Sequence, residues 1–396
     1  TITITYPKNL DLRFSSREFY EEINELEHTK QNKYTLKKQS IVPKELGQVW
    51  YGDYAPAVFV STFKNYGEFG QAYEKRAGPQ VIINDEIRDL TLSLTSGFKS
   101  RRDKAKAIYN WVAQNIRYVA LYMGAGGVVP HPASEILENR YGDCKDKSTL
   151  LITMLKVIGI DGLHALISSG DAYKLPPIPV HSPINHVITY LPEFDLYVDA
   201  TRELAPFGVL SSGNKGKPVL HSATGDLSIT PVLEAEEHGY RSALDMILNQ
   251  DGTISGSSNT EYFGLYEVDR RYQLDFFDDK DKRDYVTSYF ENFLETGDGT
   301  LHSTDVRDLN TPLVTRSQFD LDPLSNVPGP GALRIPVGLT PGDIEYFTYS
   351  APEKSATRPM RCSAYSYRQV STLQMPKNVT LLFIPESVFL QVGSYS

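Results

Sequence analysis

Cysteine is scarce in this chain: Cys144 and Cys362 are its only two among 396 residues. Two cysteines cannot form a disulfide framework, and they do not fit a structural zinc site. A single disulfide remains possible, as does a redox-sensing thiol with Cys362 as its resolving partner, but a disulfide would consume Cys144. We expect a free thiol at Cys144 and no metal site.

Long apolar runs, an excess of positive charge and several enzyme motifs are also missing. No stretch of about 18 apolar residues exists, so we predict no transmembrane helix. The formal net charge is −9, and the chain lacks the basic stripe typical of nucleic-acid-binding proteins. It also lacks the Gly-x-Ser-x-Gly elbow, the P-loop and the His-Glu-x-x-His motif. We therefore expect no nucleic-acid partner and no membrane span.

The chain starts without methionine and without a signal peptide. Its first residues, Thr1-Ile2-Thr3-Ile4-Thr5, include neither a charged region nor a long apolar one. The alternation of these residues instead indicates a strand. We expect an N-terminal β domain whose first strands precede residue 1.

Length and composition predict a folded protein of two to three domains. Hydrophobic residues make up 40% and charged residues 22% of the chain, as is typical of globular proteins. Period-two alternation at 1–6 and 48–51 predicts strands, whereas apolar residues at helical spacing predict helices near 105–116 and 144–158. We predict an α+β fold.

Three parts follow from this pattern along the chain. Residues 1–75 are expected to be β-rich, 76–232 to form a mixed core, and 233–396 to form a second β-rich domain. The pair Asp251-Gly252 between two strand-like segments predicts a hairpin. The charge-dense segment 275–284 predicts a solvated helix start rather than a calcium loop, because the central glycine of an EF-hand is missing.

Cys144 lies at the start of the predicted helix 144–158, in the run Arg140-Tyr-Gly-Asp-Cys-Lys-Asp-Lys-Ser148. Free backbone N–H groups and the positive end of the helix dipole lie there, and both favour a thiolate over a thiol. Gly142 leaves room for a substrate carbonyl. The N–H of Cys144 is then expected to point at a developing oxyanion.

A base and an orienting acid are predicted on two adjacent strands. His186 lies near the start of the strand-like segment 185–191, and Asp199 near the end of the segment 195–200. If these segments form a hairpin with an even-numbered loop, His186 and Asp199 project from the same face, directly or diagonally paired. A carboxylate in that position can hold an imidazole and stabilise imidazolium.

The motifs together resemble the transglutaminase-like branch of the papain-like superfamily, as found in bacterial proteins with a preceding β-sandwich domain of unknown function. The resemblance covers roughly residues 45–232. The matching segments are Asn115-Ile-Arg-Tyr118, Pro130-His-Pro-Ala133, Tyr141-Gly-Asp-Cys-Lys-Asp-Lys147, Asn185-His-Val-Ile188 and Val198-Asp-Ala-Thr201, with Tyr54–Thr62 resembling the end of the preceding domain.

The resemblance implies a catalytic triad on a core of helices packed against an antiparallel sheet. Cys144 is then the nucleophile, His186 the general base and acid, and Asp199 the orienting residue. An upstream side chain usually assists the oxyanion in this family, and Tyr118 or Tyr122 is expected to fill that place. No cofactor is implied, and no residue supports the calcium dependence of animal relatives. The resemblance favours a periplasmic or extracellular location.

Other residues near these motifs have competing interpretations. Asp143, next to Gly142, is expected to border the substrate. His181, in a proline-rich loop, is a candidate for a substrate contact. His164 is expected to be structural because it lies in an apolar strand pattern, and His131 is expected to be a loop contact.

The predicted function is cysteine-dependent acyl transfer on an amide or peptide bond through a thioester. Water as acceptor makes a cysteine peptidase or amidase, which is a hydrolase, whereas an amine makes a transglutaminase. The bacterial relatives favour hydrolysis, with a peptide or protein substrate. The alternative is a catalytically inactive scaffold whose β domains bind a protein or polysaccharide.

Overall fold

The computed structural model describes most of the chain. The described residues are 1–38, 45, 47–120, 127–324, 329–340, 357–361 and 364–389. Two residues named in the sequence predictions lie outside them: Tyr122, the candidate oxyanion residue, and Cys362, the candidate resolving thiol.

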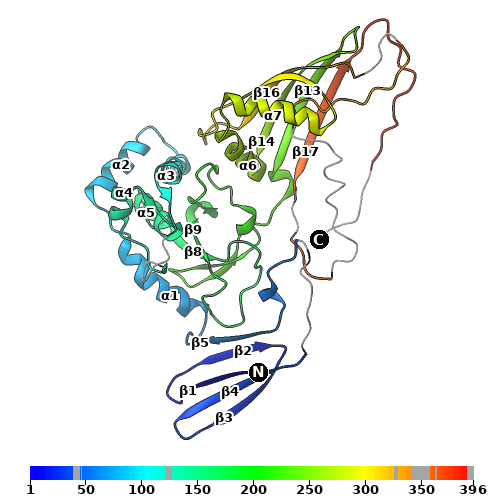
Figure 1. Ribbon diagram of the computed structural model, residues 1–396. Coiled ribbons are helices and arrows are strands. Elements are labelled where there is room, and N and C mark those ends of the chain that lie inside the picture. The colour runs from blue at the N-terminus through cyan, green and yellow to red at the C-terminus, as the bar shows by residue number, and fades with distance from the viewer. Residues whose placement is uncertain are drawn as a thin grey trace.

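The N-terminal part consists of small antiparallel sheets, as the alternation at residues 1–6 predicts. One sheet has the strand order β1-β4-β3, and a separate pair joins β2 to β5 (Figure 1). Tyr34 on β4 is fully buried. The strands are β1 (Ile2–Pro7), β2 (Arg13–Arg17), β3 (Phe19–Glu25), β4 (Thr29–Leu36) and β5 (Ala57–Ser61).

A group of helices surrounds α5, which begins at the predicted nucleophile. Every residue of α5 from Lys145 to Leu155 is buried, because α2, α3 and α4 pack against it and strands β8 and β9 contact it as well (Figure 1). The helices are α1 (Tyr66–Ala77), α2 (Asp85–Thr95), α3 (Arg101–Asn115), α4 (Ala133–Asn139) and α5 (Cys144–Val157).

An antiparallel sheet with the order β10-β9-β8-β11-β12 packs against these helices. Its strands are β8 (Leu163–Ile167), β9 (His186–Leu191), β10 (Leu196–Val198), β11 (Pro218–His221) and β12 (Leu227–Ile229). A short parallel pair, β6 (Arg117–Tyr118) and β7 (Tyr141–Gly142), leads into α5.

The C-terminal part is a second sheet with the order β15-β16-β14-β13-β17, and its neighbours are antiparallel except β13 and β17. Helices α6 and α7 cover one face of it, over a core that includes Leu244, Leu274 and Phe290 (Figure 1). The elements are β13 (Gly239–Leu248), β14 (Ile254–Phe263), α6 (Gly264–Asp275), α7 (Asp279–Asn292), β15 (Gly297–Ser303), β16 (Val314–Leu321) and β17 (Ser366–Gln374).

The predicted fold class is confirmed: a mixed core lies between β-rich parts. The hairpin at Asp251-Gly252 joins β13 to β14, and α7 begins inside the charge-dense segment, with Asp278 as its N-cap. The predicted boundary at residue 75 falls within α1, which contacts β11 of the core. The other domain boundary, at residue 232, stays a prediction.

Polar contacts join the C-terminal part to the core. Gln114 of α3 donates to the Arg307 carbonyl at 2.6 Å, and Asn110 of α3 donates to Asn310 at 3.3 Å. The guanidinium of Arg307 pairs with Glu203 at 2.7 Å.

None of the helices in the described part of the chain is long and apolar enough to cross a membrane.

Candidate active site

Cys144 is the first residue of α5, and its thiol is free and half-buried. Asp143 caps the helix: its carboxylate accepts from the N–H groups of Lys145 and Asp146, and Asp146 accepts in return from the Asp143 N–H at 3.1 Å. This capping box serves the second and third positions of the helix. The capping box does not use the N–H of Cys144, the first residue of the helix.

Gly142 approaches α5 too closely for any other residue. A Cβ atom at Gly142 would lie 2.6 Å from the Cβ of Asp146, inside van der Waals contact. Asp143, the next residue, is buried and forms an ion pair with the buried ammonium of Lys145. Asp143 thus holds the start of the helix, a structural role that its position next to the thiol does not reveal.

His186 and Asp199 meet through the hairpin formed by β9 and β10. Leu191 pairs with Leu196 and Thr189 pairs with Val198, so the index sum is odd, as predicted for an even-numbered loop. In this register His186 and Asp199 are diagonal neighbours on one face. The Nε2 atom of His186 lies 2.9 Å from an Asp199 carboxylate oxygen, and both side chains are largely buried.

The Cys144 thiol lies close enough to the imidazole of His186 to influence its pKa. Burial lowers the pKa of His186, but the charge and hydrogen bond of Asp199 and the nearby thiol of Cys144 outweigh it and raise the pKa to about 10. Burial likewise raises the pKa of Asp199, and the charge and hydrogen bond of His186 reverse that effect and lower it. Both shifts favour an imidazolium–carboxylate pair beside the thiol.

Sequence reasoning missed two residues that hold Asp199. Asn214 is fully buried and donates from its Nδ2 to the same carboxylate oxygen that His186 contacts, at 3.0 Å. Thr201 donates its hydroxyl to the other oxygen at 2.6 Å and its N–H at 3.0 Å. The Val-Asp-Ala-Thr run contained a signal for Thr201, since Asp commonly accepts from the residue two positions on. Asn214 ends a short 3-10 helix, Ser212–Asn214, and had no such signal.

Tyr73 of α1 is a further residue that the sequence did not indicate. It packs in the same hydrophobic cluster as Cys144, and among the described residues its hydroxyl has no hydrogen-bond partner although it is buried. Burial raises the pKa of Tyr73 well above its usual value, and negative charge at Cys144 is the next largest cause. The Tyr73 hydroxyl is therefore an uncommitted donor close to the thiol.

The other expected substrate residues lie around the site or apart from it. Tyr118 is 42% exposed and pairs with Gly142 across the short β6–β7 ladder. Its backbone therefore lies beside the residue that stands two positions before Cys144. Tyr122 lies outside the described residues. His181 is exposed in the loop before β9, where its carbonyl accepts from the Ile184 N–H at 2.9 Å.

His131 and His164 are held by other carboxylates. His131 contacts the buried Asp146 through both its N–H, at 2.8 Å, and its Nδ1, at 3.2 Å, so it supports the capping box. His164 is buried on β8, hydrogen-bonded to Thr149 at 2.9 Å and paired with Glu74 at 3.7 Å. The expected structural role of His164 fits these contacts.

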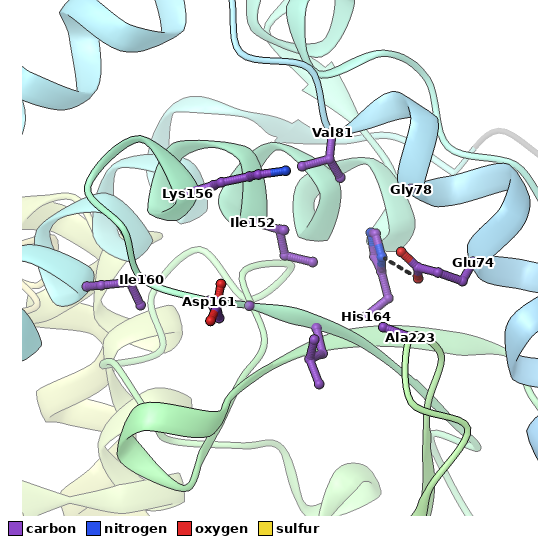
Figure 2. A pocket seen from close by; sticks show the side chains of 11 residues that line it. Glu74, Gly78, Val81, Ile152, Lys156, Ile160, Asp161, His164 and Ala223 are labelled. Carbon is purple, nitrogen blue, oxygen red and sulfur yellow. Dashed lines mark ion pairs between the residues drawn. The ribbon is translucent and has the colours of Figure 1, made fainter.

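Figure 2 shows the hollow that His164 and Glu74 border, between α1, the second half of α5 and β8. It has a volume of ≈ 170 Å³, and Lys156 and Asp161 lie at its other end. None of Cys144, His186 and Asp199 lines it. In the described part of the chain, no group of three or more metal-binding side chains is present.

Comparison with known proteins identifies the core of the chain. The sequence model of the transglutaminase-like superfamily matches residues 88–163, which include Cys144 and all of α3, α4 and α5. No curated protein matches the chain.

Two solved structures are similar at low identity. One is a proposed protease from Parabacteroides distasonis ATCC 8503, with 14% identity and a TM-score of 0.49, covering 81% of this chain and 65% of that one. The other is a proposed cysteine protease from Cytophaga hutchinsonii, with 14% identity and a TM-score of 0.24, covering 50% of this chain and 66% of that one.

The chain spans less than two thirds of the length of either structure, and neither likeness carries an argument about activity. The family match and the architecture agree with each other: the matched segment contains the central helix, and β-rich parts flank it. Residues 88–163 match the transglutaminase-like superfamily, and they lie within an α+β fold.

Proposed function

We propose that this protein is a cysteine-dependent acyl-transfer enzyme that acts on an amide or peptide bond, with Cys144 as nucleophile, His186 as general base and acid, and Asp199 as orienting residue. One observation carries the proposal. The imidazole of His186 is hydrogen-bonded to Asp199 and interacts with the thiol of Cys144, which begins a buried helix. A thiol, a base and an orienting group in that order are what covalent acyl transfer requires.

The reaction begins with the thiolate–imidazolium pair. The Cys144 thiolate attacks the amide carbonyl carbon, and the carbonyl oxygen becomes an oxyanion. His186 then gives its proton to the leaving nitrogen as the C–N bond breaks, which leaves a thioester on Cys144. Because Nε2 of His186 is bonded to Asp199, Nδ1 is the atom that exchanges this proton.

The oxyanion needs donors in place before it forms. The N–H of Cys144 is one such donor, because the capping box occupies the next two N–H groups. The unpartnered Tyr73 hydroxyl is a second candidate, since it lies in the cluster that packs against Cys144. Gly142 keeps the approach to the thiol free of a side chain.

The second half of the reaction depends on the acceptor. Neutral His186 takes a proton from water, which attacks the thioester and releases an acid, so that the enzyme is a peptidase or amidase. A primary amine in the place of water makes it a transglutaminase. We propose hydrolysis of a peptide or protein substrate, as the resemblance to bacterial relatives favours.

Alkylation of the thiol tests the proposed pair directly. A Cys362→Ala background makes Cys144 the only thiol, so iodoacetamide reports on Cys144 alone. We expect alkylation at neutral pH to be faster than that of a free cysteine, because a cationic imidazole beside the sulfur favours its reactive form. A His186→Ala variant should alkylate like free cysteine, whereas His28→Ala, at an exposed histidine, should match the background.

Acyl transfer itself is tested with a library of fluorogenic peptide amides, with and without a fluorescent primary amine. Mass spectrometry should detect an acyl adduct on Cys144, and Cys144→Ala should abolish both adduct and turnover. Slow alkylation, together with a His186 pKa that does not respond to Cys144→Ala, would contradict the proposal. That result would favour the catalytically inactive scaffold.

A further inference from the structure

A second hollow lies in the C-terminal part, between α6, α7 and the end of β14. Its volume is ≈ 340 Å³, within the range of about 300–1,000 Å³ typical of ligand pockets. Figure 1 shows α6 and α7 side by side over the sheet that contains β14. The residues that line the hollow are Tyr262, Tyr266, Asp269, Arg270, Gln273 and Tyr285.

Three tyrosines supply the apolar surface of this hollow. Tyr262 is buried at the end of β14, whereas Tyr266 on α6 and Tyr285 on α7 are half-buried. The rings of Tyr262 and Tyr266 are nearly parallel, with an interplanar angle of 4° and centroids 6.2 Å apart. Flat ring faces of this kind pack well against the C–H face of a sugar ring or against other planar groups.

Polar side chains from one face of α6 complete the hollow. Asp269 and Gln273 are exposed at the rim, one helical turn apart. Arg270 lies deeper: its guanidinium is 5.0 Å from the Tyr285 ring centroid, and its Nη1 donates to the Tyr285 hydroxyl at 3.1 Å. Among the described residues, the buried Nε of Arg270 has no hydrogen-bond partner.

The chemistry of this lining selects the class of ligand. The lining holds one carboxylate, Asp269, and one guanidinium, Arg270, so its own formal charge is zero. The Asp269 carboxylate accepts, and the Gln273 amide N–H groups and the Arg270 guanidinium donate, whereas the Gln273 amide oxygen already accepts from Arg270 Nη1. A ligand that matches them has an apolar face and several hydroxyls.

We propose that this hollow binds a neutral sugar residue of a glycan. Tyr266 and Tyr285 then pack against the ring face, and Asp269 and Gln273 hydrogen-bond to its hydroxyls. This role goes beyond the proposed acyl transfer and does not depend on the chemistry of Cys144.

The hollow also lies next to the turn that carries the orienting acid of the triad. Asp269 is 3.9 Å from Arg202, and the Arg202 N–H donates to the Asp199 carbonyl at 3.5 Å. The Arg202 guanidinium stacks on Tyr272 of α6, 5.1 Å from its centroid. A glycan held at α6 would therefore lie beside the core rather than remote from it, as expected if the substrate is a glycosylated or wall-associated peptide.

The test titrates the full chain with neutral cello-, manno-, xylo- and chito-oligosaccharides by isothermal calorimetry. We expect one series to bind, and Asp269→Ala and Gln273→Ala, both at exposed positions, to weaken that binding. Tyr266→Ala should weaken it about tenfold or more, because it removes the stacking face. Tyr20→Ala, at a tyrosine that is 63% exposed on β3, is the matched control and should leave it unchanged.

Several outcomes would overturn the proposal. Absence of binding to every neutral series by the folded wild-type chain would do so, as would binding that all three variants leave intact. Selective binding of a charged glycan or a peptide in the hollow would also exclude a neutral sugar. Thermal melting of each variant identifies loss of fold, and binding by Cys144→Ala separates this result from the fate of the proposed enzyme activity.

Discussion

Asp199 is the most heavily bonded side chain of the candidate site. His186 and Asn214 donate to one of its oxygens, and the hydroxyl and N–H of Thr201 donate to the other. A buried carboxylate with every position filled stays ionised, since each donor favours the charged form. Its charge in turn keeps a proton on His186. The electrostatic state of the site thus depends on residues that never touch a substrate.

The His186–Asp199 pair predicts a pH window for stability. The pKa of His186 rises to about 10 in the folded chain. Its contribution to the free energy of unfolding is therefore fully present below the unfolded pKa of about 6.5 and is lost as pH rises toward 10. The lowered pKa of Asp199 makes its contribution present above about 3.9 and lost at more acid pH. Both contributions are present between about pH 4 and 6.5.

In that window His186→Ala should lower the free energy of unfolding by about 3–5 kcal/mol, because it leaves the Asp199 charge buried and unpaired. Urea denaturation at a series of pH values measures the difference between wild type and variant, which should shrink toward pH 10. His28→Ala, at an exposed histidine, is the control. A difference that does not change with pH would show that the pair is not charged.

Tyr73→Phe should separate stability from activity. The hydroxyl is buried without a partner among the described residues, so its removal should leave stability unchanged or raise it by up to about 2 kcal/mol. If the hydroxyl donates to the oxyanion, turnover should fall by about 10²–10³-fold. Urea unfolding and single-turnover acylation measure the two effects, and unchanged acylation would remove Tyr73 from the mechanism.

Helix α5 is the element on which the site is built. The capping box fixes its start. The ammonium of Lys147 is buried, but it is satisfied because it donates to the carbonyls of Ala113 and Ile116 at 3.0 and 2.6 Å. Burial lowers the pKa of Lys147 to about 8. These contacts tie the first turn of α5 to the end of α3, so the thiol has a defined position relative to the helices around it.

Gly142→Ala should displace the start of α5. The new methyl group would lie 2.6 Å from the Cβ of Asp146, and relief of that overlap would open the capping box. We expect a loss of about 1–3 kcal/mol in the free energy of unfolding and slower alkylation of Cys144. The matched control is Gly97→Ala, where the added methyl group meets nothing within 4 Å. Equal stability of the two variants would contradict this account.

At the scale of the whole molecule, a buried arginine holds the loop through which the C-terminal part contacts the core. Arg271 of α6 is fully buried and pairs with Glu267 at 2.7 Å. Its guanidinium also donates to the carbonyls of Val306 and Thr311 at 2.8 and 2.6 Å. The same loop accepts from Gln114 of α3, so one side chain orders the contact between the two parts.

Arg271→Met should destabilise the C-terminal part by about 3–5 kcal/mol, because the Glu267 charge and several carbonyls lose their partner. Amide hydrogen exchange should rise at residues 305–311 first. Arg241→Met, which breaks an exposed pair with Glu261, should cost about 0–1 kcal/mol. Protection at 305–311 that matches wild type would show that the loop is held by other contacts.

Local signals in the sequence determined the fold class, the position of α5 with Cys144 at its start, and the side of the hairpin on which His186 and Asp199 project. Each of these depends on short-range rules: helical spacing, capping chemistry and strand parity. The motif order also predicted the transglutaminase-like core, which the family match supports. The catalytic roles of the three residues stay predictions that activity measurements must test.

Only the tertiary structure brought Asn214 to Asp199, Tyr73 to Cys144, and three tyrosines from β14, α6 and α7 around one hollow. These residues belong to separate elements of the chain, so no periodicity links them. Their contacts arise from packing of separate elements, and packing depends on the shapes of all the side chains together. Spacing along the chain carries no information about such contacts, so the sequence could not predict them.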